Sequence, residues 1–99
     1  MIAHLSFDIL LPTASSLKDK RQVLRSLRDR LRGRYNIAFS ETDYQELWQR
    51  ARIEIVSVNS SQKVLDESFQ RLMEDVEDVV GLESVHNYTL DFIDRREGP

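Results

Sequence analysis

The sequence predicts a single α+β domain, and three observations lead to this fold class. Three short segments alternate apolar and polar residues with the period of two typical of half-buried strands, a fourth is rich in β-branched residues, and two longer segments repeat apolar residues at helical spacing. The chain has 99 residues, which is the size of one domain and too small for two. Hydrophobic residues make up 40% of the chain and charged residues 31%, so a globular core is expected.

The composition excludes several classes of protein. No apolar run exceeds three residues, whereas a membrane-spanning helix needs about 20. The sequence contains no cysteine, which excludes a disulfide framework, a thiolate zinc site and a cysteine nucleophile. With no export signal in view, we expect a cytoplasmic protein that makes no contact with a membrane.

The first strand and the first helix are expected over residues 2–11 and 17–32. Leu5, Phe7 and Ile9 alternate with polar residues, and Pro12 ends the strand because it has no N–H to donate. Ser15 or Ser16 follows as the predicted N-cap of the helix. The helix repeats leucines at positions 17, 24, 27 and 31, and Gly33 is expected to end it in the left-handed conformation.

The rest of the chain continues the same alternation of elements. Strands are expected over residues 35–42, 52–59 and 84–94, and a second helix over residues 60–80. Ser60 or Ser61 would begin this helix and Gly81 would end it. The connector over residues 43–51 is too long for a tight hairpin and leaves room for one helical turn. Residues 95–99 contain no apolar residue and are expected to be a flexible tail.

The predicted order β-α-β-β-α-β is that of the ferredoxin-like sandwich. This fold has a four-stranded antiparallel sheet in the order 4-1-3-2, with both helices on one face. The other face would be open to water and would carry the polar side chains of the first and last strands. They are His4, Ser6, Asp8, Asn87, Thr89 and Asp91.

Two stretches carry a resemblance to a known family. They are LKDKRQVLRSLRDRL at residues 17–31, and YNIAFSE at residues 35–41 followed by DYQELWQRA at residues 43–51. Together they resemble the YlxP-like family of small bacterial proteins, a domain of unknown function, over essentially the whole chain. The resemblance implies a ferredoxin-like fold. Members resemble ribosome-maturation factors in size and are often encoded beside translation genes, but the family has no agreed activity and no accepted catalytic residues.

The sequence offers little for catalysis. His4 and His86 are the only groups that ordinarily titrate near neutral pH, and alternation predicts that they lie on opposite faces of the sheet. His4, Ser6 and Asp8 share one face, but alternate residues of a strand lie about 6 to 7 Å apart, beyond hydrogen-bond reach. The glycines fit helix ends and the tail and form no phosphate-binding loop. We therefore expect no enzyme, no cofactor and no metal site.

One charge pattern stands out. Eight of the 14 lysines and arginines lie between Lys18 and Arg34, where only Asp19 and Asp29 oppose them, although the net charge of the chain is −3. Five of these cations fall on one flank of the apolar stripe of the first helix at spacings of three or four residues. They are Lys18, Arg21, Arg25, Arg28 and Arg32. Neighbouring like charges at this spacing destabilise a helix by about 0.2 to 0.5 kcal/mol per pair, which favours an anionic neighbour.

Three interpretations of this row compete. The first is a solvated helix face, neutralised in part by Asp29 and by the acidic second helix. The second is a homo-oligomer or protein adaptor, in which the basic helix of one copy meets the acidic helix of another. The third is a surface that follows the phosphates of structured RNA, on its own or on a ribosomal subunit, since guanidinium groups suit phosphate geometry. None of the three requires sequence-specific reading of DNA.

The connector adds three candidate residues to this surface. Trp48, Gln49 and Arg50 could anchor a partner, because Trp and Arg contribute strongly to interfaces. Packing of Trp48 and Leu47 over the edge of the sheet is the favoured alternative. The predicted function is thus that of a non-enzymatic binding module whose working surface is the basic helix and the connector.

Overall fold

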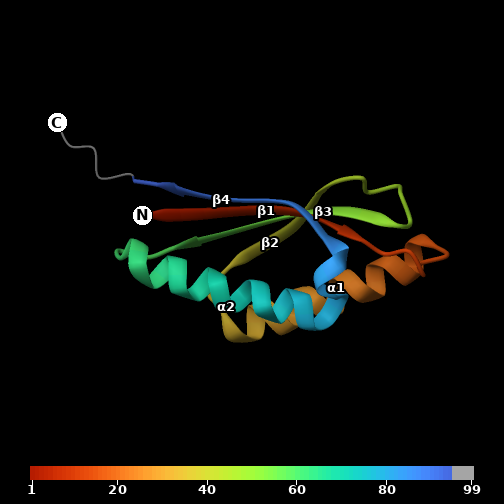
Figure 1. Ribbon diagram of the computed structural model, residues 1–99, viewed down its shortest axis with the longest axis horizontal. Helices are drawn as coiled ribbons and strands as arrows, with labels where there is room; N and C mark the ends of the chain where they lie inside the picture. Colours follow the sequence, from red (N-terminus) through yellow and green to blue (C-terminus); the bar gives the residue numbers. More distant parts are fainter. Residues whose placement is uncertain (95–99) are drawn as a thin grey trace.

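The computed structural model describes residues 1–94 and contains the predicted elements in the predicted order. The strands are β1 (Ile2–Leu10), β2 (Ala38–Asp43), β3 (Arg50–Val58) and β4 (Val85–Ile93). The helices are α1 (Leu17–Arg34) and α2 (Gln62–Val80), and a short 3-10 turn, η1 (Leu82–Ser84), precedes β4. Figure 1 shows both helices on the same side of the sheet. The expected flexible tail lies outside the described residues.

The four strands form one antiparallel sheet in the order β2-β3-β1-β4, which confirms the predicted topology. β1 lies in the centre, where Leu5 is opposite Ile55 of β3 and Leu90 of β4. Two irregularities interrupt the ladders. One is in β4 opposite Phe7, and the other is in β2 between Glu41 and Asp43.

The core lies between the sheet and the helices. Leu5, Phe7 and Ile9 of β1 are fully buried, as are Ile53 and Ile55 of β3. The helices cover them with the apolar stripes that the sequence predicts. These stripes include Leu24, Leu27 and Leu31 of α1 and Leu65, Phe69, Leu72 and Val76 of α2. Each side chain of this size contributes about 1.5 to 3 kcal/mol when it is removed from water.

The helix ends confirm most of the predicted caps. The hydroxyls of Ser16 and Ser61 accept hydrogen bonds from the backbone N–H groups of Asp19 and Val64, so each serine caps its helix. Gly81 ends α2 with φ +90°.

The prediction for Gly33 is wrong. Helix α1 continues through this residue to Arg34, and the N–H of Tyr35 still donates to the carbonyl of Leu31 at 2.8 Å. Arg34 and Tyr35 both bind Asp75 of α2, and these contacts hold the last turn in place.

Candidate functional site

The five cations predicted on one flank of α1 form the surface that we call the α1 basic row: Lys18, Arg21, Arg25, Arg28 and Arg32. Arg28 binds Asp29, the residue next to it, at 3.0 Å. Lys18 follows the cap of α1 and precedes Asp19, whose carboxylate accepts hydrogen bonds from the N–H and hydroxyl of Ser15. The other three arginines are exposed, and among residues 1–94 they have no carboxylate within ion-pair distance.

The opposite flank of α1 is neutralised by α2. Arg34 binds the buried carboxylate of Asp75 at 2.6 Å, and Arg30 lies 3.4 Å from Asp75 and 3.7 Å from Asp78. The hydroxyl of Tyr35 donates a third contact to Asp75 at 2.6 Å. Asp75 and Asp78 of α2 therefore neutralise Arg30 and Arg34, and no carboxylate of α2 pairs with the α1 basic row.

Asp75 and Tyr35 influence each other's titration. The hydrogen bond from Tyr35 outweighs the effect of burial and, with Arg34 and Arg30, lowers the pKa of Asp75. Burial, followed by the hydrogen bond to Asp75, raises the pKa of Tyr35 to about 12. Both shifts favour the pair in its observed state, with a neutral phenol that donates to a carboxylate.

Three members of the α1 basic row border a hollow between α1 and β2. Arg21, Arg25 and Arg28 line this space of about 290 Å³ together with Leu24 of α1 and with Phe39, Ser40 and Glu41 of β2. Glu41 contributes little negative charge to the hollow, because its carboxylate lies 2.7 Å from the amine of Lys20. The hollow therefore gathers three guanidinium groups around one concave surface.

Lys20 is a residue whose role sequence reasoning missed. Its side chain is 1% exposed, and its ammonium group donates to the carbonyls of Tyr44 at 2.8 Å, Arg50 at 3.2 Å and Gln45 at 3.3 Å. A buried ammonium group is stable only when it is paired and hydrogen-bonded, and this one satisfies both conditions. The sequence does carry a signal, since position 20 belongs to the apolar stripe of Leu24, Leu27 and Leu31. Lys20 thus fastens both ends of the connector to α1.

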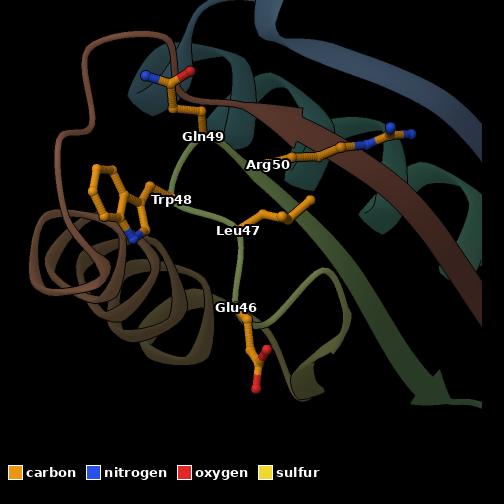
Figure 2. A pocket seen from close by; sticks show the side chains of 5 residues that line it. All are labelled: Glu46, Leu47, Trp48, Gln49 and Arg50. Carbon is orange, nitrogen blue, oxygen red and sulfur yellow. The ribbon is translucent and has the colours of Figure 1, made fainter.

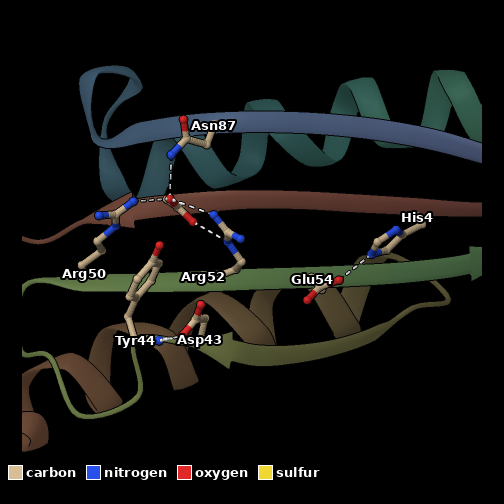
Figure 3. A network of polar contacts seen from close by, with 8 residues as sticks. His4, Asp43, Tyr44, Arg50, Arg52, Glu54 and Asn87 are labelled. Carbon is tan, nitrogen blue, oxygen red and sulfur yellow. Dashed lines mark hydrogen bonds and ion pairs between the residues drawn. The ribbon is translucent and has the colours of Figure 1, made fainter.

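Asp8 is not on a water-facing surface, and that prediction is wrong. The residue is 0% exposed, and four side-chain hydrogen bonds surround its carboxylate. Arg52 donates from Nε at 2.8 Å and from Nη2 at 3.3 Å, and Arg50 and Asn87 donate at 2.8 Å each. Figure 3 shows how these donors come from two strands and converge. Burial alone would raise the pKa of Asp8, but the bonds from Arg52, Arg50 and Asn87 outweigh it and hold the pKa far below its usual value.

Two residues with unusual backbone conformations complete this network. Tyr44 has φ +62°, and its ring lies 4.2 Å from the guanidinium carbon of Arg50 and 5.6 Å from that of Arg52. Asn87 has φ +54° and occupies the irregularity of β4, which turns its amide toward Asp8. Left-handed backbone is uncommon for residues other than glycine, so tertiary contacts must hold both conformations. Tyr44 also places an aromatic ring beside the open face, where the strands alone supply none.

The histidines do not separate as predicted. The irregularity of β4 shifts its alternation, so that His86 is opposite Asp8 while Val85 is opposite the buried Ile9. His86 therefore lies on the same face of the sheet as His4. It is opposite Asp8, which is four residues after His4 in β1. His4 binds Glu54 at 2.7 Å, and His86 lies 3.0 Å from the backbone carbonyl of Glu83. Within residues 1–94, no three His, Asp or Glu side chains come together in a way that could hold a metal ion.

The connector presents Trp48 to solvent, contrary to the favoured prediction. Trp48 is 52% exposed and Leu47 is 50% exposed. Figure 2 shows the indole pointing toward the turn before α1, while Leu47 and Arg50 point to the other side. Gln49 does not point outward to a partner. Its amide donates to the carbonyls of Pro12 and Ala14 at 3.3 and 3.1 Å.

The connector contains no helical turn, and hydrogen bonds attach it to α1, to β1 and to the turn before α1. It consists of a turn from Tyr44 to Leu47, with the N–H of Leu47 donating to the carbonyl of Tyr44. Lys20 binds it from α1, Arg50 binds Asp8, and Gln49 binds residues 12 and 14. Of the three predicted connector residues, Gln49 and Arg50 are engaged within the chain. The Trp48 indole makes no hydrogen bond with residues 1–94.

Comparison with known proteins places the chain in a family. Residues 2–89 match the family described as protein of unknown function (DUF503). The chain is similar to the uncharacterized protein YlxP of Bacillus subtilis (strain 168), with 34% identity over 73 residues that cover 74% of this chain and 79% of YlxP. Neither α1 nor α2, the two α-helices within residues 1–94, could span a membrane.

A solved structure shares the fold. It is a C-terminal segment of the alpha subunit of aIF2 from Pyrococcus abyssi, with a TM-score of 0.54 and 19% identity. The match covers 97% of this chain and 52% of the other, so this chain spans about half the length of that structure. The likeness extends to the fold alone. With the match over residues 2–89, the chain belongs to the DUF503 family, the YlxP-like family that its residues 17–31 and 35–51 resemble.

Proposed function

We propose that this protein is a non-enzymatic RNA-binding module that contacts the phosphates of structured RNA with the α1 basic row. One observation supports this proposal above all. The carboxylates of α2 neutralise Arg30 and Arg34, whereas Arg21, Arg25 and Arg32 have no anionic partner within residues 1–94. If carboxylates of the same chain neutralised the α1 basic row, no external partner would be needed. Such ion pairs are found with α2 only for Arg30 and Arg34, on the other flank of α1.

The geometry of the row suits a phosphate backbone. Lys18 and Arg32 are 14 positions apart in one helix, so the row is about 21 Å long. A duplex presents several phosphates over that length. Guanidinium groups bind phosphate oxygens through two parallel hydrogen bonds, and the hollow between α1 and β2 brings three of them together.

The acidic remainder of the chain sets the orientation of the complex. The net charge is −3, so the protein as a whole does not attract RNA. Glu74 and Glu77 of α2 have no ion pair within residues 1–94 and would repel phosphates. Binding should therefore be confined to the flank of α1 that faces β2.

Salt dependence tests the proposal. The affinity for a labelled hairpin RNA should fall with a log–log slope between about −2.5 and −4.5, as expected for three to five contacts with duplex phosphates. The double variant R21E/R25E should abolish binding. The matched control is K63E/R71E, which makes the same change in net charge on α2 and should bind as the wild type does. Binding that ignores salt, or equal loss in both double variants, would contradict the proposal.

The alternative function is that of a homo-oligomeric or adaptor module without nucleic acid. The free carboxylates of Glu74 and Glu77 favour it, because they could meet the α1 basic row of a second copy. Light scattering over a range of salt concentrations distinguishes the two functions. A dimer that dissociates in salt and in R21E/R25E supports the homo-oligomer, and a monomer under all conditions excludes it.

A further inference from the structure

Trp48 is exposed in a way that the fold does not require. It is the only tryptophan of the chain, it is 52% exposed, and its indole N–H has no acceptor within residues 1–94. A large aromatic side chain normally gains stability by burial, and Leu47 beside it is also half exposed. Together with Glu46, Gln49 and Arg50, these two residues line an open hollow of about 510 Å³.

The backbone that carries Trp48 is unusually well fixed for an irregular connector. Lys20 is hydrogen-bonded to the carbonyls on both sides of Trp48, at Gln45 and Arg50. The carbonyl of Gln49 accepts from the N–H of Leu11 at 2.9 Å, and its amide binds Ala14. A ligand that contacts the ring therefore does not have to order the connector first, which lowers the entropic cost of binding.

The position of Trp48 relates it to the α1 basic row. Its neighbour Gln49 binds residues 12 and 14 in the turn before α1, and Lys20 in the first turns of α1 binds the connector. Lys18 lies two residues before Lys20 and Arg21 directly after it, and both are exposed. In Figure 2 the ring is directed to this end of α1. An exposed aromatic ring thus lies near the N-terminal end of the α1 basic row, of which Arg21, Arg25 and Arg32 have no carboxylate partner within residues 1–94.

An exposed aromatic ring next to a row of cations favours a nucleobase as the ligand of Trp48. Single-stranded segments of RNA bind by stacking bases on aromatic rings while cations hold the adjacent phosphates. A protein partner that filled the hollow with an apolar side chain would gain nothing from the adjacent cations unless it also carried acidic groups. Resting on the proposed function, we propose that Trp48 stacks on an unpaired base, and that the preferred ligand is a helical RNA stem with a single-stranded extension.

Intrinsic fluorescence gives a direct test, because Trp48 is the sole source of tryptophan emission. The full chain is titrated with a hairpin carrying a short 3′ extension and with a blunt duplex of the same number of phosphates. We expect quenching of Trp48 by the extended hairpin and tighter binding of it than of the duplex. Emission that is unchanged at saturation with the extended hairpin would overturn the stacking proposal.

Two variants separate stacking from general apolar contact. W48A should weaken binding of the extended hairpin by about 5- to 150-fold, the range of a single aromatic stack, and W48F should recover part of the loss. L47A removes a neighbour of similar exposure and should have little effect. Equal losses in W48A and L47A would overturn the proposal in favour of apolar contact. Circular dichroism establishes that each variant is folded.

The outcomes also separate this inference from the proposed function. If W48A binds both RNAs as the wild type does, with the same salt slope, stacking is wrong and phosphate binding by the α1 basic row stands. If neither RNA binds in a salt-dependent way, both proposals fail. If Trp48 is instead needed to capture a protein from nuclease-treated lysate and neither RNA alters its emission, the occupant is a protein and the stacking proposal is overturned.

Discussion

Asp8 of β1 and Arg52 of β3 are opposite each other in the sheet, and the Nε of Arg52 donates to Oδ1 of Asp8 at 2.8 Å. This cross-strand pair brings a fully buried carboxylate next to arginine side chains that remain about one third exposed. Arg50, two residues before Arg52, binds the same carboxylate and begins β3 where the connector ends. Through Arg50, Asp8 therefore also links the centre of the sheet to the loop that displays Trp48.

Substitution of Asp8 should destabilise the fold. D8N removes the charge and places an amide NH₂ against groups that can only donate. We expect a loss of about 2 to 3 kcal/mol in the free energy of unfolding, because a buried group loses its partners while the arginines keep some access to water. Urea denaturation measures the change. The control is D91N, an exposed position on β4, where the loss should stay within about 0.5 kcal/mol.

The same carboxylate should make stability depend on pH in the acid range. The pKa of Asp8 is lowered in the folded protein from an ordinary value of 3.8, so the unfolded chain takes up a proton first as the pH falls. Its contribution is fully present above about pH 5 and declines as the pH falls through and below the ordinary value. The free energy of unfolding of D8N should fall less steeply over this range than that of the wild type. If the free energies of unfolding of D8N and the wild type changed in parallel with pH, the pKa of Asp8 would not be lowered in the folded protein.

Lys20 should control both stability and the order of the connector. K20M leaves three carbonyls and the carboxylate of Glu41 without their buried donor. We expect a loss of about 2 to 4 kcal/mol, together with faster hydrogen exchange in residues 44–50. K18M is the control, since Lys18 is exposed and belongs to the same turn of α1. A connector that exchanges equally slowly in K20M would contradict the anchoring role.

The two glycines at helix positions should respond in opposite directions. Gly33 lies inside α1, and a Cβ there would meet no atom within 4 Å, so G33A should stabilise the protein by about 0.5 to 1 kcal/mol. Gly81 has φ +90°, a conformation that side-chain-bearing residues rarely adopt. G81A should therefore cost about 1 kcal/mol or more. Thermal denaturation of the two variants compares them directly, and destabilisation by G33A would indicate that the end of α1 needs glycine after all.

Local patterns were sufficient to predict the architecture. Alternation along Leu5, Phe7 and Ile9 defined β1, and the leucines of α1 defined the face of the helix that meets the core. The order of elements then left one favoured sheet topology. The segregation of cations between Lys18 and Arg34 is likewise a property of helical spacing, so the α1 basic row was visible in the sequence.

Single-residue environments were less predictable, because distant segments create them. Alternation within β1 predicts that Asp8 faces water, but its hydrogen-bond partners lie 42, 44 and 79 residues away in the sequence. The irregularity that turns Asn87 toward it also moved His86 to the open face, and no local pattern announces such an extra residue.

The sequence by itself determined the order of the elements, the sheet topology, the core faces and the clustering of positive charge, since these follow from periodicity along short segments. Only the tertiary structure decided which charges are neutralised and which groups are displayed. Asp75 of α2 forms an ion pair with Arg34. Lys20 and Asp8 hold the connector through hydrogen bonds at Arg50, and Trp48 of this connector is exposed. The physical reason is that a charge or an aromatic ring acquires its environment from whatever the fold packs beside it.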